Sequence, residues 1–134
     1  MAHARGRVSG PALRKWGWRG GFLLAVVVQL YGLYAPTQPG PPGIPYLDKV
    51  SHCVIFAAVA YLGLRARIPA RWLLGALVAH AVVSELIQGY LLPSRSGDPF
   101  DALADVLGVA IGAWFGFRAL RRAPGAVQKL PGTT

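Results

Sequence analysis

Four apolar stretches follow one another along the chain, separated by short polar or proline-rich connectors. The first lies within residues 20–47, where no residue is charged, and the others begin near residues 50, 72 and 100. With interfacial residues included, each stretch reaches about 17–21 residues, close to the ~20 that a helix needs to cross a bilayer. We therefore predict four membrane-spanning helices, at about residues 18–35, 48–64, 71–92 and 99–120.

The connectors are rich in residues that end helices. The first, residues 36–45, holds five prolines and two glycines, the second contains Pro69, and the third runs from Pro93 to Pro99. Proline cannot continue a helix, because it lacks the amide hydrogen and clashes with the preceding turn. The predicted organisation is a basic N-terminal segment, a single four-helix domain and a polar tail, at residues 1–17, 18–120 and 121–134.

Composition supports a membrane protein. Hydrophobic residues make up 54% of the 134 positions and charged residues only 14%, which excludes a disordered tail or a coiled coil. The single cysteine excludes an intramolecular disulfide framework and a multi-cysteine zinc site. The predicted fold class is all-α, an integral membrane four-helix bundle in contact with the lipid bilayer.

The net charge of +9 is distributed unevenly. Twelve of the fourteen Lys and Arg residues precede the first stretch, lie between the second and third, or follow the fourth. These positions share one side if four helices alternate, and the positive-inside rule makes that side cytoplasmic. We expect a multi-pass protein of the cell membrane with both termini cytoplasmic, and the segregation argues against nucleic-acid binding. A cleaved signal peptide is the less favoured reading of the first stretch, which is long and is followed by Pro36.

The other side of the predicted bundle carries every acid in the chain and the two remaining cations, with a formal charge of −3 when histidine is neutral. Several of these groups are three or four residues apart, so they share helix faces. Ionisable groups within the hydrocarbon cost about 2.5–3.5 kcal/mol each on insertion scales, so they should face the bundle interior and partner one another. We predict an outward-facing polar pocket formed by Lys49, His52, Glu85, Gln88, Arg95, Asp98, Asp101 and Asp105.

The pocket residues suggest two kinds of role. His52 and Glu85 are the candidate catalytic residues, because imidazole and carboxylate groups can exchange protons with a ligand. Lys49 and Arg95 would hold a phosphate or carboxylate. The candidate ligand-binding residues are Lys49, Gln88, Arg95, Asp98, Asp101 and Asp105. Since the pocket is negative overall, an anionic ligand would need a bridging divalent cation or ion pairs within the pocket.

Three alternatives remain open. The polar groups could be interhelical hydrogen bonds and ion pairs that hold the bundle together. The protein could be a membrane-embedded hydrolase or transferase, with Mg²⁺, Mn²⁺ or Ca²⁺ held by Asp98, Asp101 or Asp105. It could also be a structural or partner-binding protein, since a face of small residues suits close packing or a homo-oligomer through Gly108, Gly112 and Gly116. His80, deep in the third helix, is expected to be a hydrogen-bonded structural histidine rather than a proton relay.

The order and spacing of these motifs resemble the VanZ-like family. The motifs are K-x-x-H, E-x-x-Q and P-x-R-x-x-D-x-x-D, followed by two glycines four residues apart. They are carried by Lys49, His52, Glu85, Gln88, Pro93, Arg95, Asp98, Asp101, Gly108 and Gly112. The chain departs from the pattern at Asp105, where the family usually has Asn. The resemblance spans residues 48–116 and implies a small four-helix membrane protein with a cell-envelope lipid or a glycopeptide-related ligand. The best-known relative confers low-level resistance to teicoplanin.

Overall fold

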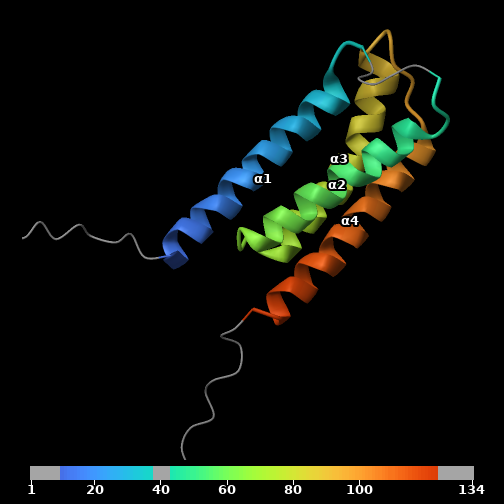
Figure 1. Cartoon of the computed structure of the whole chain (residues 1–134). Helices are drawn as coiled ribbons and strands as arrows, with labels where there is room; N and C mark the ends of the chain where they lie inside the picture. Colours follow the sequence, from blue (N-terminus) through green and yellow to red (C-terminus); the bar gives the residue numbers. More distant parts are fainter. Residues whose placement is uncertain (1–9, 38–42, 124–134) are drawn as a thin grey trace, which may run out of the picture.

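The computed structural model describes residues 10–37 and 43–123, and over these ranges the chain consists of four helices without strands (Figure 1). They are α1 (Gly10–Tyr34), α2 (Leu47–Arg65), α3 (Ala70–Leu91) and α4 (Pro99–Arg121). The predicted all-α class is confirmed for the described residues. Residues 1–9 of the basic segment, 38–42 of the first connector and 124–134 of the tail lie outside them.

Helix boundaries agree with the sequence for α2, α3 and α4, but not for α1. Helices α2, α3 and α4 begin and end within about one residue of the expected positions, close to the prolines and glycines of the connectors. α1 begins at Gly10, eight residues before the expected start at residue 18. The reason is that Ala, Leu, Arg and Lys between Gly10 and Gly17 are good helix formers, and proline is tolerated in a first turn. Part of the predicted basic segment is therefore helical.

Three of the described helices, α2, α3 and α4, are long and apolar enough to cross a membrane. Large apolar side chains point away from the bundle, and Leu24, Val54, Leu86 and Leu107 are each 52–66% exposed. Helices that are apolar on their outer faces as well as their inner ones are typical of membrane spans. These features indicate a multi-pass membrane protein. α1 carries Arg14, Lys15 and Arg19 in its first half, so its crossing remains a prediction, as do the cytoplasmic termini.

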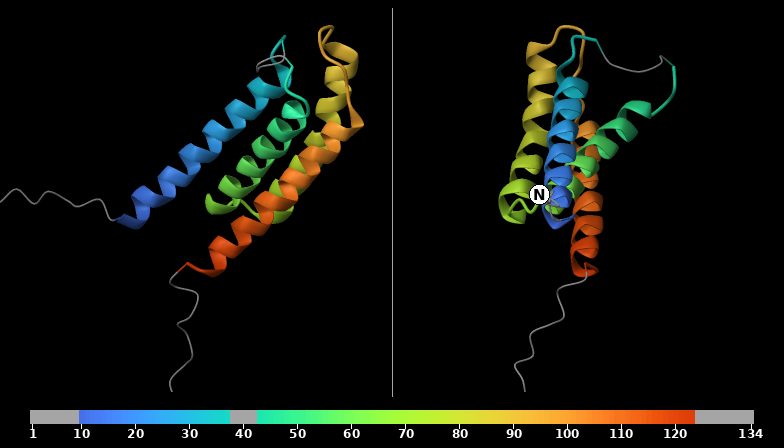
Figure 2. Two further views of the ribbon diagram at one scale, coloured as in Figure 1. Left: turned by 45° about the vertical axis from the view of Figure 1, so that its right-hand side comes forward. Right: turned by 60° about the vertical axis from the view of Figure 1, so that its left-hand side comes forward.

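The end of α1, the start of α2 and the α3–α4 connector lie at one end of the molecule, which we call the connector end (Figure 1). The start of α1, the α2–α3 turn and the end of α4 lie at the other end. α2 runs between α1 and α4 (Figure 2). Buried apolar side chains of all four helices form the core below the connector end: Leu33, Phe56, Val59, Ala60, Leu64, Leu73, Leu77, Ala81, Val109 and Ala113.

Glycines bring α4 unusually close to α2. A Cβ atom on Gly108 would lie 2.2 Å from the carbonyl oxygen of Cys53, and one on Gly112 would lie 2.2 Å from that of Ala57. Since both distances are far below van der Waals contact, only glycine fits at these two positions. Together with Gly116, these glycines are buried against α2 of the same chain. A homo-oligomer through this face remains a prediction, and here the face already has an intramolecular partner.

The close contact between α2 and α4 also determines which of their side chains meet nearer the start of each helix. α2 and α4 run in the same direction from the connector end, so each step of four residues along one helix matches four along the other. One turn before the Gly108 contact, α4 carries Asp105 on the same face, and α2 presents His52 beside it. One further turn up, Asp101 of α4 faces Lys49 of α2.

Candidate functional site

Lys49 joins α2 to the start of α4. Its Nζ donates to Asp98 Oδ2 at 2.5 Å and to Asp101 Oδ1 at 2.8 Å. Asp98 is the N-cap of α4, and its Oδ1 accepts a hydrogen bond from the amide of Phe100. The hydrogen bond from Lys49, followed by that from the Phe100 amide, holds the pKa of the Asp98 carboxyl below its ordinary value. Lys49 therefore serves as an internal counter-ion, so its charge is already matched before any ligand arrives.

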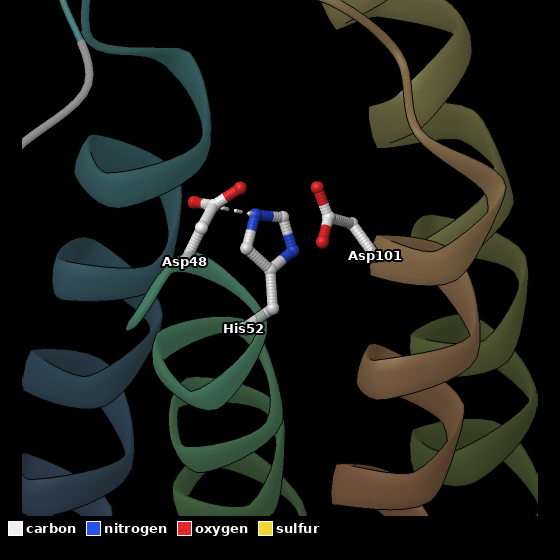
Figure 3. Close-up of side chains that lie close together, drawn as sticks. All are labelled: Asp48, His52 and Asp101. Atoms are coloured by element: carbon white, nitrogen blue, oxygen red, sulfur yellow. Dashed lines mark ion pairs between the residues drawn. The ribbon is translucent and has the colours of Figure 1, made fainter. Parts of the chain in front are cut away.

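His52 is the centre of the site. It is buried in α2, and its Nδ1–H donates to Asp105 Oδ1 at 2.9 Å. Its Nε2 lies 3.8 Å from Asp48 Oδ1, while Nδ1 lies 4.0 Å from Glu85 Oε1. Figure 3 shows the imidazole ring between Asp48 of the same helix and Asp101 of α4. We call these five residues, Asp48, His52, Glu85, Asp101 and Asp105, the acid–histidine cluster.

The connector before α4 positions the side chain of Glu85. Glu85 Oε2 accepts a hydrogen bond from the backbone amide of Asp98 at 2.8 Å. The connector can come so near α3 because Gly97 has no side chain, since a Cβ atom there would lie 2.5 Å from the Glu85 carbonyl oxygen. The connector therefore holds Oε2 of Glu85, while Oε1 faces His52.

Two oxygens of the cluster lack a hydrogen-bond partner. They are Glu85 Oε1 and Asp105 Oδ2, on side chains whose residues are 8% and 0% exposed. Buried polar atoms in folded proteins are nearly always paired, and an unpaired acceptor costs about 1–3 kcal/mol. The cluster therefore contains acceptors for a donor or a cation that the chain's described residues do not supply.

The ligand atoms are close enough to share a metal ion. One atom each from His52, Glu85 and Asp105 lie within 4.8 Å of one another, and the same is true of Asp48, His52 and Asp101. Both unpaired oxygens are on residues of the first of these groups. A set dominated by carboxylate oxygens suits Mg²⁺, Mn²⁺ or Ca²⁺.

The balance of charges around His52 also favours a bound cation. The four carboxylates of the cluster and that of Asp98 face Lys49 and, at most, one positive charge on His52. Counted as ionised, these carboxylates outnumber the cations even with His52 protonated. Unmatched charge in a low-dielectric interior is expensive, so an added cation would stabilise this arrangement.

Arg95 lies on the other side of His52, across a cleft. Its Nη1 donates to the carbonyl oxygens of Gly32 at 3.0 Å and Ala35 at 3.5 Å, near the end of α1. A guanidinium is favourable there, because the last carbonyls of a helix carry partial negative charge. The cleft measures about 250 Å³ and lies between α1 and α2, and its lining includes Asp48, His52 and Arg95. It gives a ligand a route to the histidine.

Two polar residues singled out in the sequence lie outside the cluster. Gln88 of α3 is buried and donates from Nε2 to the carbonyl of Leu33 at 2.9 Å, so it ties α3 to α1. His80 Nε2 is 2.8 Å from the Tyr34 hydroxyl, and its ring packs against Phe56. This hydrogen bond agrees with the expected structural role of His80. The predicted set thus divides into a converging cluster, the Lys49 ion pairs, and two residues that bind the backbone of α1.

The sequence-based site omitted Asp48. Asp48 precedes His52 by four residues, which places the two side chains on one helix face, and that spacing could have identified it. It lines the cleft together with His52, so it belongs to the part of the cluster that a ligand reaches first.

The fold and the site together define an all-helical, multi-pass membrane protein with a buried acid–histidine cluster at one end. Comparison of the chain with protein-family models, with curated proteins and with solved structures finds no match. The resemblance to the VanZ-like family therefore rests on the motifs in the sequence.

Proposed function

We propose that this chain is a VanZ-like membrane protein that binds a phosphate-bearing component of the cell envelope. In this proposal a divalent cation held by the acid–histidine cluster forms part of the binding site. The observation that carries it is the pair of unpaired, buried oxygens, Glu85 Oε1 and Asp105 Oδ2, beside His52.

The cation supplies what the cluster lacks. It would take the two unpaired oxygens and His52 Nδ1 as ligands, with Nδ1 giving up its proton and its hydrogen bond to Asp105 Oδ1, and it would offset the carboxylates around them. Small local movements suffice, because one ligand atom from each of the three residues already lies within 4.8 Å of the other two. Acids at this depth would otherwise be stable only as neutral groups or in further ion pairs.

The cleft determines which ligand is favoured. Once a cation offsets the acids behind His52, Arg95 supplies the positive charge that faces the cleft. A guanidinium group binds phosphate oxygens strongly. A volume of about 250 Å³ suits a phosphate head group rather than a whole lipid or glycopeptide, whose remainder would extend outward. With the expected orientation, the cleft faces the cell envelope, and the family resemblance adds a link to glycopeptide resistance.

A second candidate function is a metal-assisted hydrolase or transferase. It is favoured by the position of His52, which reaches the cleft on one side and the candidate metal ligands on the other. A cation held by Asp48, His52 and Asp101, of which Asp48 and His52 line the cleft, would polarise a phosphoryl oxygen there, while His52 or Glu85 exchanged a proton with the reacting group. Turnover of a phosphate ester by the purified protein separates this activity from binding alone.

Calorimetric titration tests the cation site. The metal-free full chain in detergent should bind Mg²⁺ or Mn²⁺, and Glu85→Gln or Asp105→Asn should weaken binding by about tenfold or more. Both replacements keep the shape of the side chain, and unchanged helicity by circular dichroism would show that the fold persists. Tyr90→Phe is the matched control, since Tyr90 is near the same end of α3 but 84% exposed. Absence of binding by the unaltered protein, or equal weakening by Tyr90→Phe, would contradict the proposal.

A further inference from the structure

A second, strongly basic cleft lies at the opposite end of the molecule. It measures about 570 Å³ and is lined by residues of the first half of α1, the end of α2 with the turn after it, and the end of α4. Figure 2 shows the start of α1, the turn after α2 and the end of α4 at this end of the molecule. Five cationic side chains from three parts of the fold line it: Arg14, Lys15, Arg65, Arg67 and Arg122. None of the described residues in its lining is acidic. Its walls also include apolar groups, among them Trp18 and Leu120.

Arg67 occupies a backbone conformation that favours glycine. Its φ is 66°, in the left-handed region, directly after the C-cap of α2. The amide of Arg67 donates to the carbonyl of Leu64, and that of Ile68 donates to the carbonyl of Gly63. These two bonds form a Schellman motif, whose left-handed position is usually glycine. An arginine there goes against local preference, which is a reason to look for a role of its side chain.

Arg65 is held at the wall of the cleft by an aromatic contact. Its guanidinium carbon lies 4.2 Å from the ring centroid of Trp18 in α1, so the α2 end is tied to α1. Stacking of this kind orients the planar group while its N–H donors remain available. Arg118 and Arg121 provide a contrast, because they lie at the same end but do not line this cleft.

We propose that this basic cleft binds the phosphate head group of an anionic phospholipid from the adjoining leaflet. Arginine forks bind phosphate oxygens bidentately, and basic pockets between spanning helices are suited to anionic head groups. The apolar walls at Trp18 and Leu120 would contact the part of the lipid next to the head group. General attraction to an anionic surface needs only net charge, whereas this cleft brings cations from separate elements around one cavity. The proposal is independent of the acid–histidine cluster at the other end.

Native mass spectrometry of the full chain in detergent tests this site. Titration with phosphatidylglycerol should give a bound lipid, whereas phosphatidylcholine should bind much more weakly. Arg67→Gly should weaken phosphatidylglycerol binding about fivefold, the effect expected for one cation near an anionic lipid. The same variant should unfold at an equal or higher temperature, since glycine suits the left-handed position. Weaker lipid binding would then not reflect a lost fold.

Arg121→Gln is the matched control, because it removes one cation from the same end outside the cleft. It should leave lipid binding within about twofold of the unaltered protein, well short of the one-cation effect. Equal weakening by Arg121→Gln and Arg67→Gly would overturn the proposal in favour of diffuse electrostatics. Binding of inorganic phosphate is measured as a second control. Phosphate binding as tight as that of phosphatidylglycerol would show that a soluble anion is the ligand and would overturn the assignment to lipid.

Discussion

His52 Nδ1 and Asp105 Oδ1 are 2.9 Å apart and join α2 to α4 where both residues are buried. The contact lies one turn from the point at which Gly108 meets the backbone of α2, so it depends on close helix packing. The contact matters for function because Asp105 has a second buried oxygen without a partner, in a cluster of four carboxylates and one histidine.

Asp105→Asn should separate the structural role of this residue from its role in binding. The Asn carbonyl can still accept the hydrogen bond from His52, so thermal stability should change little, whereas cation affinity should fall about tenfold or more. Asp105→Ala removes the acceptor as well and should cost about 1–3 kcal/mol of stability. Thermal unfolding and titration with Mn²⁺ measure the two effects. Equal stability of the Asn and Ala variants would contradict the structural role.

Lys49 should make the stability contribution of Asp98 depend on pH. The hydrogen bond from Lys49 lowers the pKa of Asp98 in the folded protein, so the unfolded chain binds a proton more readily there. The contribution is therefore present above the ordinary Asp pKa of about 3.9 and is lost as pH falls through the lowered value. The difference in melting temperature between the unaltered protein and Asp98→Asn should be constant from pH 7 to 5 and shrink in stronger acid. A difference that grows on acidification would contradict this assignment.

Gly112→Ala should disrupt the contact between α2 and α4. Its Cβ atom would lie 2.2 Å from the Ala57 carbonyl oxygen, so the helices must separate. We expect a lower melting temperature and weaker cation binding at the cluster above. Gly75→Ala is the control, because nothing lies within 4 Å of a Cβ there and alanine is the better helix former by about 1 kcal/mol. If Gly112→Ala altered only the oligomeric state, the glycine face would serve an interface between copies instead.

The proposed link to glycopeptide resistance can be tested in a susceptible bacterium. Expression of the unaltered chain should raise tolerance to teicoplanin, and Arg95→Ala or Glu85→Gln should abolish the increase. Arg95 lines the cleft, and Glu85 is a candidate ligand of the cation on the other side of His52. Membrane abundance must be equal among the strains, which immunoblotting of membrane fractions establishes. Full tolerance with either variant at equal abundance would contradict the proposed role of the cleft.

Much of the architecture follows from local sequence features. Prolines and glycines in the connectors determine where α2, α3 and α4 begin and end. The helical spacing of Lys49, His52, Asp101 and Asp105 was enough to predict that these groups share one region of the bundle.

Other features depend on contacts between helices that spacing does not reveal. Lys49 is paired with the chain's own acids, and Gln88 and Arg95 bind carbonyl groups of α1. The early start of α1 reflects good helix formers outside the apolar stretch. The sequence does not predict the left-handed backbone of Arg67, because this conformation is usually signalled by a glycine and residue 67 is an arginine.

The central claim is that His52 and its neighbouring carboxylates hold a divalent cation, and pulsed electron paramagnetic resonance of bound Mn²⁺ tests it most directly. The unaltered protein should show coupling of Mn²⁺ to a histidine nitrogen, and His80→Gln, which changes a histidine outside the cluster, should keep it. His52→Gln should lose the coupling. Absence of bound Mn²⁺ in the unaltered protein, or a nitrogen coupling that persists in His52→Gln, would contradict the account.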